Sequence, residues 1–252
     1  MTNRKILVTG SSRGIGRAVA QAFAAAGDAV AVHHRASPDL AAQVLASLPG
    51  DGHVVVQADI ADPRAVQTMV DSAADQLGGL DVLVNNAASY GRSAHPIGEV
   101  SYDQWQQVWR DTIDLNLVGA ANVTWCAVQH MIAAGGGRIV NVSSRGAFRG
   151  EPGQPAYGAS KAGLNALGQS LAVALAPHNI TVAAVAPGFV ETDMAAAHLT
   201  GARGAAIRAQ SPFDRVAQPE EIAAAVVFLA SPEAEWASGA ILDLNGASYL
   251  RT

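Results

Sequence analysis

The sequence predicts an α/β fold: a doubly wound domain whose seven-stranded parallel sheet is flanked by helices on both faces. Short runs rich in Val, Ile and Leu alternate with longer Ala-rich segments of helical periodicity, which is typical of repeated βαβ units. The short runs are apolar without alternating polar residues, as expected for strands that are covered on both faces. No Pro-, Gly- or Ser-rich linker divides the 252 residues, so we expect a single domain over 1–252.

The elements follow from these patterns in chain order. Strands are expected at 5–9, 29–33, 54–58, 82–85, 138–142, 180–186 and 241–244, and helices at 14–26, 38–48, 63–77, 102–133, 156–176 and 219–230. Ligands of such sheets bind outside the carboxyl ends of the strands. The residues that follow each strand are therefore the candidates for a functional site.

Composition argues against several classes of function. A formal net charge of −5 makes nucleic-acid binding unexpected, because such proteins need a basic face. No apolar run approaches about 18 residues, so we expect no membrane span, and the first residues lack the features of a signal peptide. Cys126 is the single cysteine, which rules out an internal disulfide and fits a cytoplasmic location.

The first predicted strand runs into Thr9-Gly10-Ser11-Ser12-Arg13-Gly14-Ile15-Gly16, which opens the first helix. Glycines let the backbone approach a pyrophosphate closely, and a helix N-terminus supplies free amides and a favourable dipole. A glycine-rich turn at the first strand–helix junction therefore predicts a dinucleotide phosphate site. A tight turn that binds nothing is the alternative.

The residues after the second strand bear on the choice of cofactor. An NAD site usually has an acid here that binds ribose hydroxyls, but the sequence is His33-His34-Arg35. Arg35 and Arg13 are placed to flank a 2′-phosphate, so NADP(H) is favoured over NAD(H); solvated surface charge is the alternative. A metal site is not expected, because neighbouring strand residues face opposite sides and no acid or Cys completes a ligand set.

Polar residues also follow the third and fourth strands. Asp59 and Ile60 are placed to bracket an adenine, while a helix cap is an equal alternative for Asp62. Asn85 and Asn86 are expensive to bury unless their amides are used. This pair therefore predicts a structural network or one that contacts the cofactor.

Tyr157 and Lys161 carry the catalytic hypothesis. Their spacing of four places both on one face of a helix, where an ammonium favours the phenolate and lowers the phenol pKa. Chance is a poor explanation, because the chain has only two Lys against 14 Arg. Ser144, after the fifth strand, is placed to hold a substrate oxygen by hydrogen bonding. Asn116 marks a kink, a water site or a mere interruption of its helix.

The sixth strand ends at Pro187-Gly188 and leads into an irregular stretch, 189–214. A loop of this length inside a compact domain is usually functional, so we expect a substrate-binding lid. Arg145 and Arg149 follow Ser144 directly and are placed to recognise an anionic group, although exposure to solvent is the more conservative expectation.

Taken together, these residues resemble the short-chain dehydrogenase/reductase family in its single-domain form. The Thr-Gly-x-x-x-Gly-x-Gly turn, Asn-Asn-Ala, the Ser, the Tyr-x-x-x-Lys pair and Pro-Gly occur in the family's order and spacing over essentially the whole chain. The resemblance implies a Rossmann-type domain that transfers a hydride between a nicotinamide and a carbonyl or secondary alcohol.

The resemblance also implies a role for each matched residue. Tyr157 would be the general acid/base, Lys161 would lower its pKa and bind the nicotinamide ribose, and Ser144 would orient the substrate oxygen. Asn116 would hold a water in a proton relay through Lys161. The expected cofactor contacts are Gly10, Ser12, Arg13, Gly14, Ile15 and Gly16 at the phosphates, Arg35 at the 2′-phosphate, Asp59 and Ile60 at the adenine, Asn86 and Ala87 at the ribose, and Pro187, Gly188, Val190 and Thr192 near the nicotinamide, together with Tyr157 and Lys161.

The main expectation is an NADP(H)-dependent oxidoreductase acting on a free small molecule. Relatives by motif include 3-oxoacyl-carrier-protein reductases, which is an alternative function, but an acidic chain whose stretch 131–137 has no charge matches an acidic carrier poorly. A nucleotide-sensing protein without catalysis is a further alternative, although it would not need Tyr157 and Lys161. A homotetramer built on the two long helices is expected by family analogy.

Overall fold

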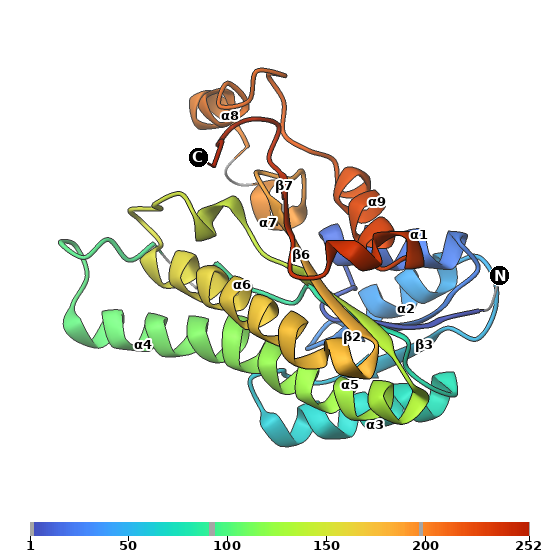
Figure 1. The fold of residues 1–252 in the computed structure, drawn as a ribbon. Coiled ribbons are helices and arrows are strands. Elements are labelled where there is room, and N and C mark those ends of the chain that lie inside the picture. The colour runs from blue at the N-terminus through green and yellow to red at the C-terminus, as the bar shows by residue number, and fades with distance from the viewer. Residues whose placement is uncertain (1–2, 91–93, 197–198, 252) are drawn as a thin grey trace.

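The computed structural model describes residues 3–90, 94–196 and 199–251, and within them lies a seven-stranded sheet (Figure 1). Its strands are β1 Lys5–Val8, β2 Ala29–His34, β3 Val54–Gln57, β4 Val82–Asn85, β5 Gly137–Val142, β6 Ile180–Pro187 and β7 Ile241–Leu244. All pair in parallel, in the order β3-β2-β1-β4-β5-β6-β7. The expected fold class is confirmed, and each strand begins and ends within one residue of its predicted position.

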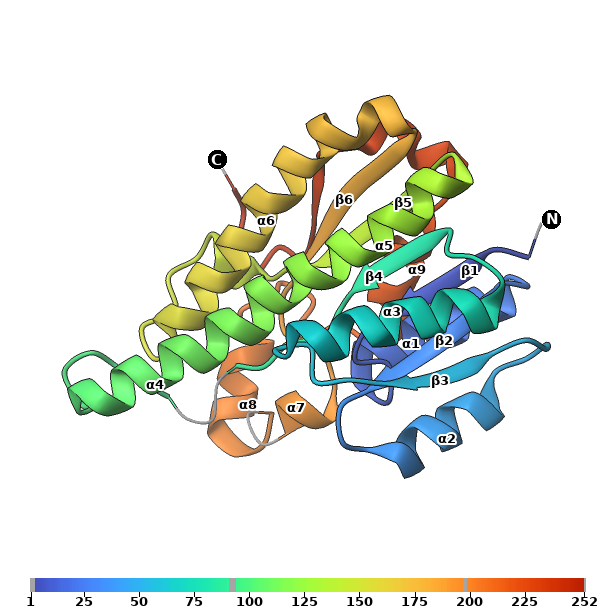
Figure 2. The same cartoon turned by 90° about the horizontal axis from the view of Figure 1, so that it is seen from below.

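Helices cover both faces of the sheet (Figures 1 and 2). One face carries α1 Gly14–Ala25, α2 Pro38–Ser47 and α9 Pro219–Leu229, and the other carries α3 Pro63–Leu77, α5 Ala120–Ala134 and α6 Pro155–Leu175, with α4 Tyr102–Ile113 leading into α5. Each face has its own core: Ile6 and Val8 of β1 pack with Phe23 in one, and Leu7 packs with Met131 in the other. This two-sided burial explains why the strands are apolar without alternation.

Local sequence signals set the ends of several helices. The Asp62 carboxylate accepts from the amide of Arg64 at 2.9 Å, so Asp62 caps α3, as its alternative predicted. Gly78 ends the same helix with a left-handed φ of 76°, a conformation that favours glycine. Ser101 and Gln104 form a reciprocal capping box at the start of α4.

The helix expected at 102–133 is one continuous rod that includes a π-helical segment, Asp114–Gly119, between α4 and α5. Asn116 lies inside this segment, so the predicted irregularity occurs where the Asn indicated it. By length and composition alone the rod, Tyr102–Ala134, is long enough to cross a membrane. It packs against α3 and α6, and a buried helix of a globular protein passes the same test.

The prediction of an irregular stretch over 189–214 is wrong in part, because it contains two short helices, α7 Asp193–Ala196 and α8 Gly201–Arg208. Residues 197–198 of the expected lid lie outside the described residues. The sequence of α8 includes Gly201 and Gly204, which lower helix propensity, so its pattern did not indicate a helix. Figure 1 shows α7 and α8, in orange, beyond the end of β6.

Candidate active site

A cleft of about 570 Å³ opens at the carboxyl ends of the strands. It crosses the point where the order of strands reverses between β1 and β4, which is where sheets of this kind bind ligands. All but one of the expected catalytic and cofactor-binding residues line it. They are Gly10, Ser12, Arg13, Gly14, Ile15, Gly16, Arg35, Asp59, Ile60, Asn86, Ala87, Ser144, Tyr157, Lys161, Pro187, Gly188, Val190 and Thr192. The exception is Asn116.

The glycine turn forms a tight cradle at the floor of this cleft. Gly10 has a φ of 65°, and a Cβ added there would lie 2.9 Å from the Cα of Ala87. A Cβ on Gly16 would collide with the carbonyl oxygen of Gly10 and the side-chain amide of Asn86. Asn86 Nδ2 donates to the carbonyl oxygens of Thr9 at 2.9 Å and Gly10 at 3.1 Å. The turn therefore leaves room for a close ligand only because glycines occupy it.

His33 holds the turn from the other side, a role that the sequence did not indicate. Its Nδ1 accepts from the amide of Gly10 at 2.8 Å, and its Nε2 lies 3.1 Å from the carbonyl oxygen of Ala58. Burial lowers the pKa of His33 to about 4, so the ring is neutral at pH 7 and donates through Nε2. With both ring nitrogens used in this way, His33 is not available as a metal ligand. The described residues hold no cluster of three or more metal-ligating side chains.

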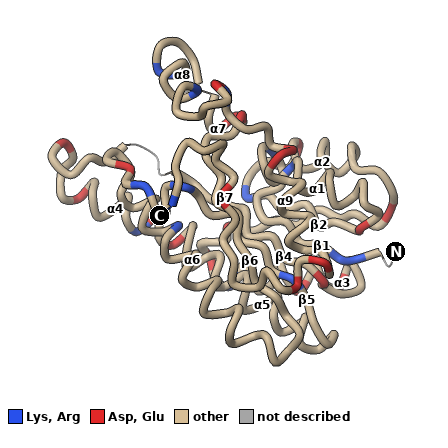
Figure 3. Tube along the Cα trace, turned by 45° about the horizontal axis from the view of Figure 1, so that its top comes forward, with Lys and Arg blue, Asp and Glu red and all other residues tan. Residues whose placement is uncertain are grey.

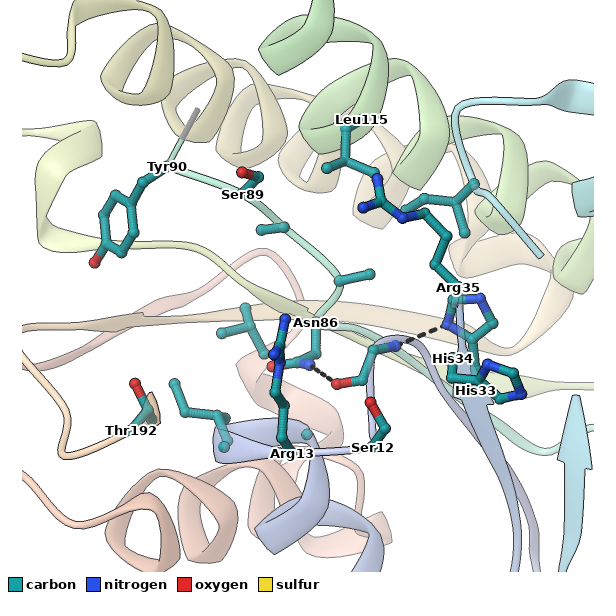
Figure 4. Close-up of a pocket in the computed structure, with 18 of the residues that line it drawn as sticks. Ser12, Arg13, His33, His34, Arg35, Asn86, Ser89, Tyr90, Leu115 and Thr192 are labelled. Carbon is teal, nitrogen blue, oxygen red and sulfur yellow. Dashed lines mark hydrogen bonds between the residues drawn. The ribbon is translucent and has the colours of Figure 1, made fainter. Parts of the chain in front are cut away.

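Two arginines, Arg13 and Arg35, line the cleft on either side of the glycine turn. Figure 4 shows Arg13 rising from the glycine turn, with Arg35 and the two histidines on the other side of the turn. An Nη1 of Arg35 lies 3.9 Å from an Asp59 oxygen, and the two side chains are 64% and 46% exposed. This long, solvated ion pair is weak, so the Arg35 guanidinium remains available to a phosphate.

Tyr157, Ser144 and Lys161 meet at the opposite end. The Tyr157 phenol is buried, and the Ser144 hydroxyl lies close enough to lower the pKa of that phenol; the Ser144 oxygen accepts from the amide of Gly146 at 3.0 Å. Lys161 Nζ donates to the carbonyl oxygen of Val142 at 2.7 Å and lies 5.9 Å from the centre of the Tyr157 ring. The expected approach of the Ser144 hydroxyl to the phenol is confirmed.

Burial dominates the electrostatics of this group. It raises the pKa of Tyr157 well above its ordinary value, and it lowers the pKa of Lys161 to about 8. Lys161 Nζ donates to the Val142 carbonyl oxygen, and Lys161 is not among the groups that shift the phenol pKa. That Lys161 lowers the phenol pKa stays a prediction.

Tyr90 belongs to the site and was missed by the sequence analysis. Its ring centre lies 4.4 Å from that of Tyr157, and its hydroxyl and its charged form both raise the pKa of Tyr157. In Figure 4 Tyr90 lies on the side of the cleft away from Arg35. Only its position four residues after Asn86 could have indicated it.

Asn116 is buried beneath this end of the cleft rather than lining it. Its side chain accepts from the amide of Ser89 at 2.9 Å and donates to the Ser89 carbonyl oxygen at 2.9 Å. Nδ2 also lies 3.1 Å from the Ser160 hydroxyl oxygen, and that hydroxyl donates to the Tyr157 carbonyl oxygen at 2.8 Å. Asn116 therefore connects the segment after β4, which carries Ser89 and Tyr90, to α6, which carries Tyr157.

Asn85, which precedes Asn86, is a structural residue, since its side chain donates to Thr124 at 2.8 Å and to Asn141 at 2.9 Å.

Arg145 overturns an expectation. Instead of facing solvent it is 4% exposed, with its guanidinium 5.0 Å from the centre of the Phe189 ring.

Comparison with known proteins places this geometry in a family. A family model described as Enoyl-(Acyl carrier protein) reductase matches residues 10–246. The chain is 36% identical over 244 residues to a 3-oxoacyl-[acyl-carrier-protein] reductase of Vibrio cholerae, covering 97% of this chain and 96% of the relative. It is 40% identical over 245 residues to the cis-4-hydroxycyclohexanecarboxylate dehydrogenase of Sinomonas cyclohexanicum, covering 96% and 95%.

A solved structure shares the fold closely. It is the crystal structure of a short chain dehydrogenase from Burkholderia cenocepacia in complex with NADP, 36% identical, with a TM-score of 0.88 and coverage of 98% of both chains. The resemblance drawn from the motifs is confirmed by both kinds of match. The chain therefore belongs to the short-chain dehydrogenase/reductase family of NAD(P)-dependent oxidoreductases.

Proposed function

We propose that the protein transfers a hydride between NADP(H) and a carbonyl or secondary alcohol of a small molecule, with Tyr157 as the general acid/base. The observation that carries this proposal is the buried phenol of Tyr157, which lies beside Ser144 and Lys161 in a cleft whose floor is the glycine cradle. When bound, NADPH supplies the hydride, and NADP+ accepts it in the reverse direction.

The cleft fits a dinucleotide. The glycine turn would hold the phosphates, Asp59 and Ile60 the adenine, Asn86 and Ala87 the ribose, and Pro187, Gly188, Val190 and Thr192 the nicotinamide end, since all of them line it. Arg13 and Arg35 at the adenosine end favour NADP(H) over NAD(H), because a 2′-phosphate would meet two guanidinium groups. The related structure from Burkholderia cenocepacia was solved with NADP, which supports the same choice.

The residues divide the proton chemistry between them. Because its pKa is raised, Tyr157 is protonated at neutral pH and can donate its proton to a carbonyl oxygen during reduction. Ser144 would hydrogen-bond the same oxygen. Lys161, with a pKa of about 8, is mostly protonated at pH 7 and would return a proton to Tyr157 and bind the nicotinamide ribose. Asn116 would order a water in that proton relay, and in the described structure it already fixes the backbone beside Tyr90.

The substrate we favour is a free small molecule. The acidic net charge of −5 and the uncharged stretch 131–137 suit an acidic carrier protein poorly. A 3-oxoacyl-carrier-protein reductase remains the second candidate, because the Vibrio cholerae relative carries that name. A nucleotide-sensing protein without catalysis is disfavoured, because Ser144, Tyr157 and Lys161 all line the cleft.

Absorbance of NADPH under steady state, with a panel of free ketones and matched carrier-bound 3-oxoacyl substrates, tests these candidates. Turnover of free ketones supports the main proposal, and a preference of tenfold or more for carrier-bound substrates would replace it with the second. Binding of NADPH without turnover of any substrate would instead support a nucleotide-sensing protein without catalysis.

The role of Tyr157 is tested by Tyr157→Phe, which removes the transferable proton. We expect a loss of turnover of roughly 10²–10⁴-fold with little change in the affinity for NADPH measured by fluorescence titration. Tyr102→Phe is the matched control, because Tyr102 is 73% exposed on α4. A Tyr157→Phe variant with near-full activity would rule out the acid/base role.

The assembly we propose is a cytoplasmic homotetramer that binds neither nucleic acid nor a membrane. Its support is the large apolar side chains that the single chain leaves exposed, which include Trp125 on α5 at 63%, Val173 on α6 at 80% and Trp236 at 99%. Exposed aromatic groups of this size are typical of interfaces. Light scattering coupled to size-exclusion chromatography should give four times the 25.7 kDa chain mass; a monomeric mass would contradict this assembly.

A further inference from the structure

A second cavity, of about 270 Å³, lies behind one wall of the cleft. Two short segments of chain separate them, because Ser144 and Val190 line the cleft whereas the adjacent Arg145 and Phe189 line the second cavity. The other walls come from the expected lid and from the turn after β7, and they include Ile207, Ser211, Phe213, Leu244 and Ser248. The cavity therefore combines apolar side chains with one buried cation, Arg145, and with a solvated ion pair, Arg215–Glu221, whose charges offset each other.

The cation, Arg145, is held by neutral partners. Its Nη1 donates to the Ser248 hydroxyl at 2.6 Å, and its Nη2 donates to Oε1 of Gln210 at 2.7 Å. The half-buried Arg149 donates to the same Gln210 oxygen at 3.0 Å; Arg149 and Gln210 adjoin the cavity through Arg145 and do not themselves line it. A guanidinium has five N–H donors, so both arginines retain donors beyond those that have acceptors among the described residues.

No carboxylate of the described part of the chain bonds directly to Arg145 or Arg149. Neither Arg145 nor Arg149 forms an ion pair there, and Glu151 acts on Arg145 only through space. Burial and the charge of Arg149 both lower the pKa of Arg145. Figure 3 shows Lys and Arg positions beside the C-terminus, with Asp and Glu positions among them. A buried cation beside a like charge is costly unless an anion compensates it.

We propose that the second cavity binds an organic carboxylate. The carboxylate replaces the Gln210 amide oxygen as the shared acceptor of Arg145 and Arg149, because guanidinium groups bind carboxylates in a planar, often bidentate arrangement. The apolar body of the ligand packs against Phe189 and Ile207. Without the carboxylate, the neutral oxygens of Gln210 and Ser248 accept from the guanidinium of Arg145 and hold it in place.

The carboxylate has two possible sources. Arg145 follows Ser144 directly and interacts electrostatically with Tyr90, so a substrate held by Ser144 has its far end close to the cavity. In that case the cavity takes the acid group of a hydroxy or oxo acid. The other source is a separate carboxylate that binds behind the wall of the cleft and acts on the lid.

Calorimetric titration of the cofactor-free protein with cyclohexanecarboxylate, and with the neutral cyclohexanecarboxamide, tests the proposal. We expect the carboxylate to bind at least about tenfold more tightly, since hydrogen bonds to charged groups are the stronger ones. Arg149→Gln should remove about tenfold of that affinity and leave the amide unaffected. Arg64→Gln, which makes the same charge change at an exposed position of α3, is the matched control and should change neither.

Arg145→Lys keeps the positive charge but removes the planar guanidinium group, so it should also lower the affinity for the carboxylate about tenfold. If that variant does not fold, Arg149→Gln decides alone. Equal affinity for carboxylate and amide, no saturable binding, or an Arg149→Gln variant that binds normally would overturn the proposal, because Arg145 would then only tie the lid to the C-terminal turn.

Inhibition kinetics distinguish the two sources. Inhibition by cyclohexanecarboxylate that is competitive with a ketone substrate identifies the cavity as a substrate subsite, and binding that leaves the ketone KM unchanged identifies a separate carboxylate. The titration needs neither cofactor nor turnover, so its outcome does not depend on the function proposed above.

Discussion

Replacing Lys161 by Met should change the pH dependence of stability by a predictable amount. Lys161 is 2% exposed, and burial lowers its pKa from 10.5 to about 8. The folded pKa lies below the unfolded one, so between these two pH values the unfolded chain binds more protons and the free energy of unfolding rises with pH. The difference of about 2.5 pKa units corresponds to roughly 3 kcal/mol.

A methionine side chain does not titrate, so this pH-dependent contribution would vanish in the Lys161→Met variant. The lost hydrogen bond to Val142 changes stability equally at every pH and cancels in the comparison. We therefore expect the stability of Lys161→Met, relative to the parent protein, to fall by up to about 3 kcal/mol as the pH rises from 7.5 to 10.

Urea unfolding followed by tryptophan fluorescence at the two pH values measures this difference. The chain offers a matched control in its other lysine, because Lys5 Nζ makes only an exposed hydrogen bond to the carbonyl oxygen of Asn3; Lys5→Met therefore measures the effect of removing a lysine outside the buried site. A stability difference for Lys161→Met that is the same at pH 7.5 and pH 10 would refute the claim that folding depresses the pKa of Lys161.

The remaining predictions concern the cleft. Tyr90→Phe should move the pH profile of alcohol oxidation to lower pH, because Tyr90 raises the pKa of Tyr157; an unchanged profile would exclude this influence. Arg35→Gln should weaken NADP+ binding about 10- to 100-fold, since it removes charge-assisted hydrogen bonds, while NAD+ binding changes little; equal losses would mean that Arg35 does not contact the 2′-phosphate. Asp59→Asn should strengthen NADP+ binding by up to about fivefold, because the ion pair it removes, at 3.9 Å, is worth about 1 kcal/mol at most. Gly16→Ala should abolish measurable NADP+ binding in a fluorescence titration, because its Cβ would displace the Gly10 carbonyl; normal affinity would show that the cradle is not the phosphate site.

Much of the fold and of the cleft could be predicted because the signals are local. The apolar runs placed every strand within a residue, and the glycine turn and the Tyr157–Lys161 spacing are properties of single segments. Most of the residues predicted at the cofactor site follow strands, and parallel strands bring their carboxyl ends together without further information.

The features that were missed depend on contacts between distant segments. His33, in β2, bridges Gly10 and Ala58 only because the neighbouring strands β1 and β3 place these residues on either side of it. Arg145 is buried because the turn after β7 and the end of α8 close over it, through Ser248 and Gln210. The raised pKa of Tyr157 likewise reflects burial, which no residue spacing measures.

The π-helical segment Asp114–Gly119 determines which side of α5 faces the sheet. A π-turn contains one residue more than an α-turn, so winding the same residues as a regular α-helix would rotate α5 by about 100° relative to α4. The stripe of α5 that holds Val123, Ala127 and Met131 at 0% exposure would then swing away from the sheet. One additional residue in the turn thus lets a polar side chain, Asn116, point inward while the apolar side of the rod keeps its alignment with the sheet.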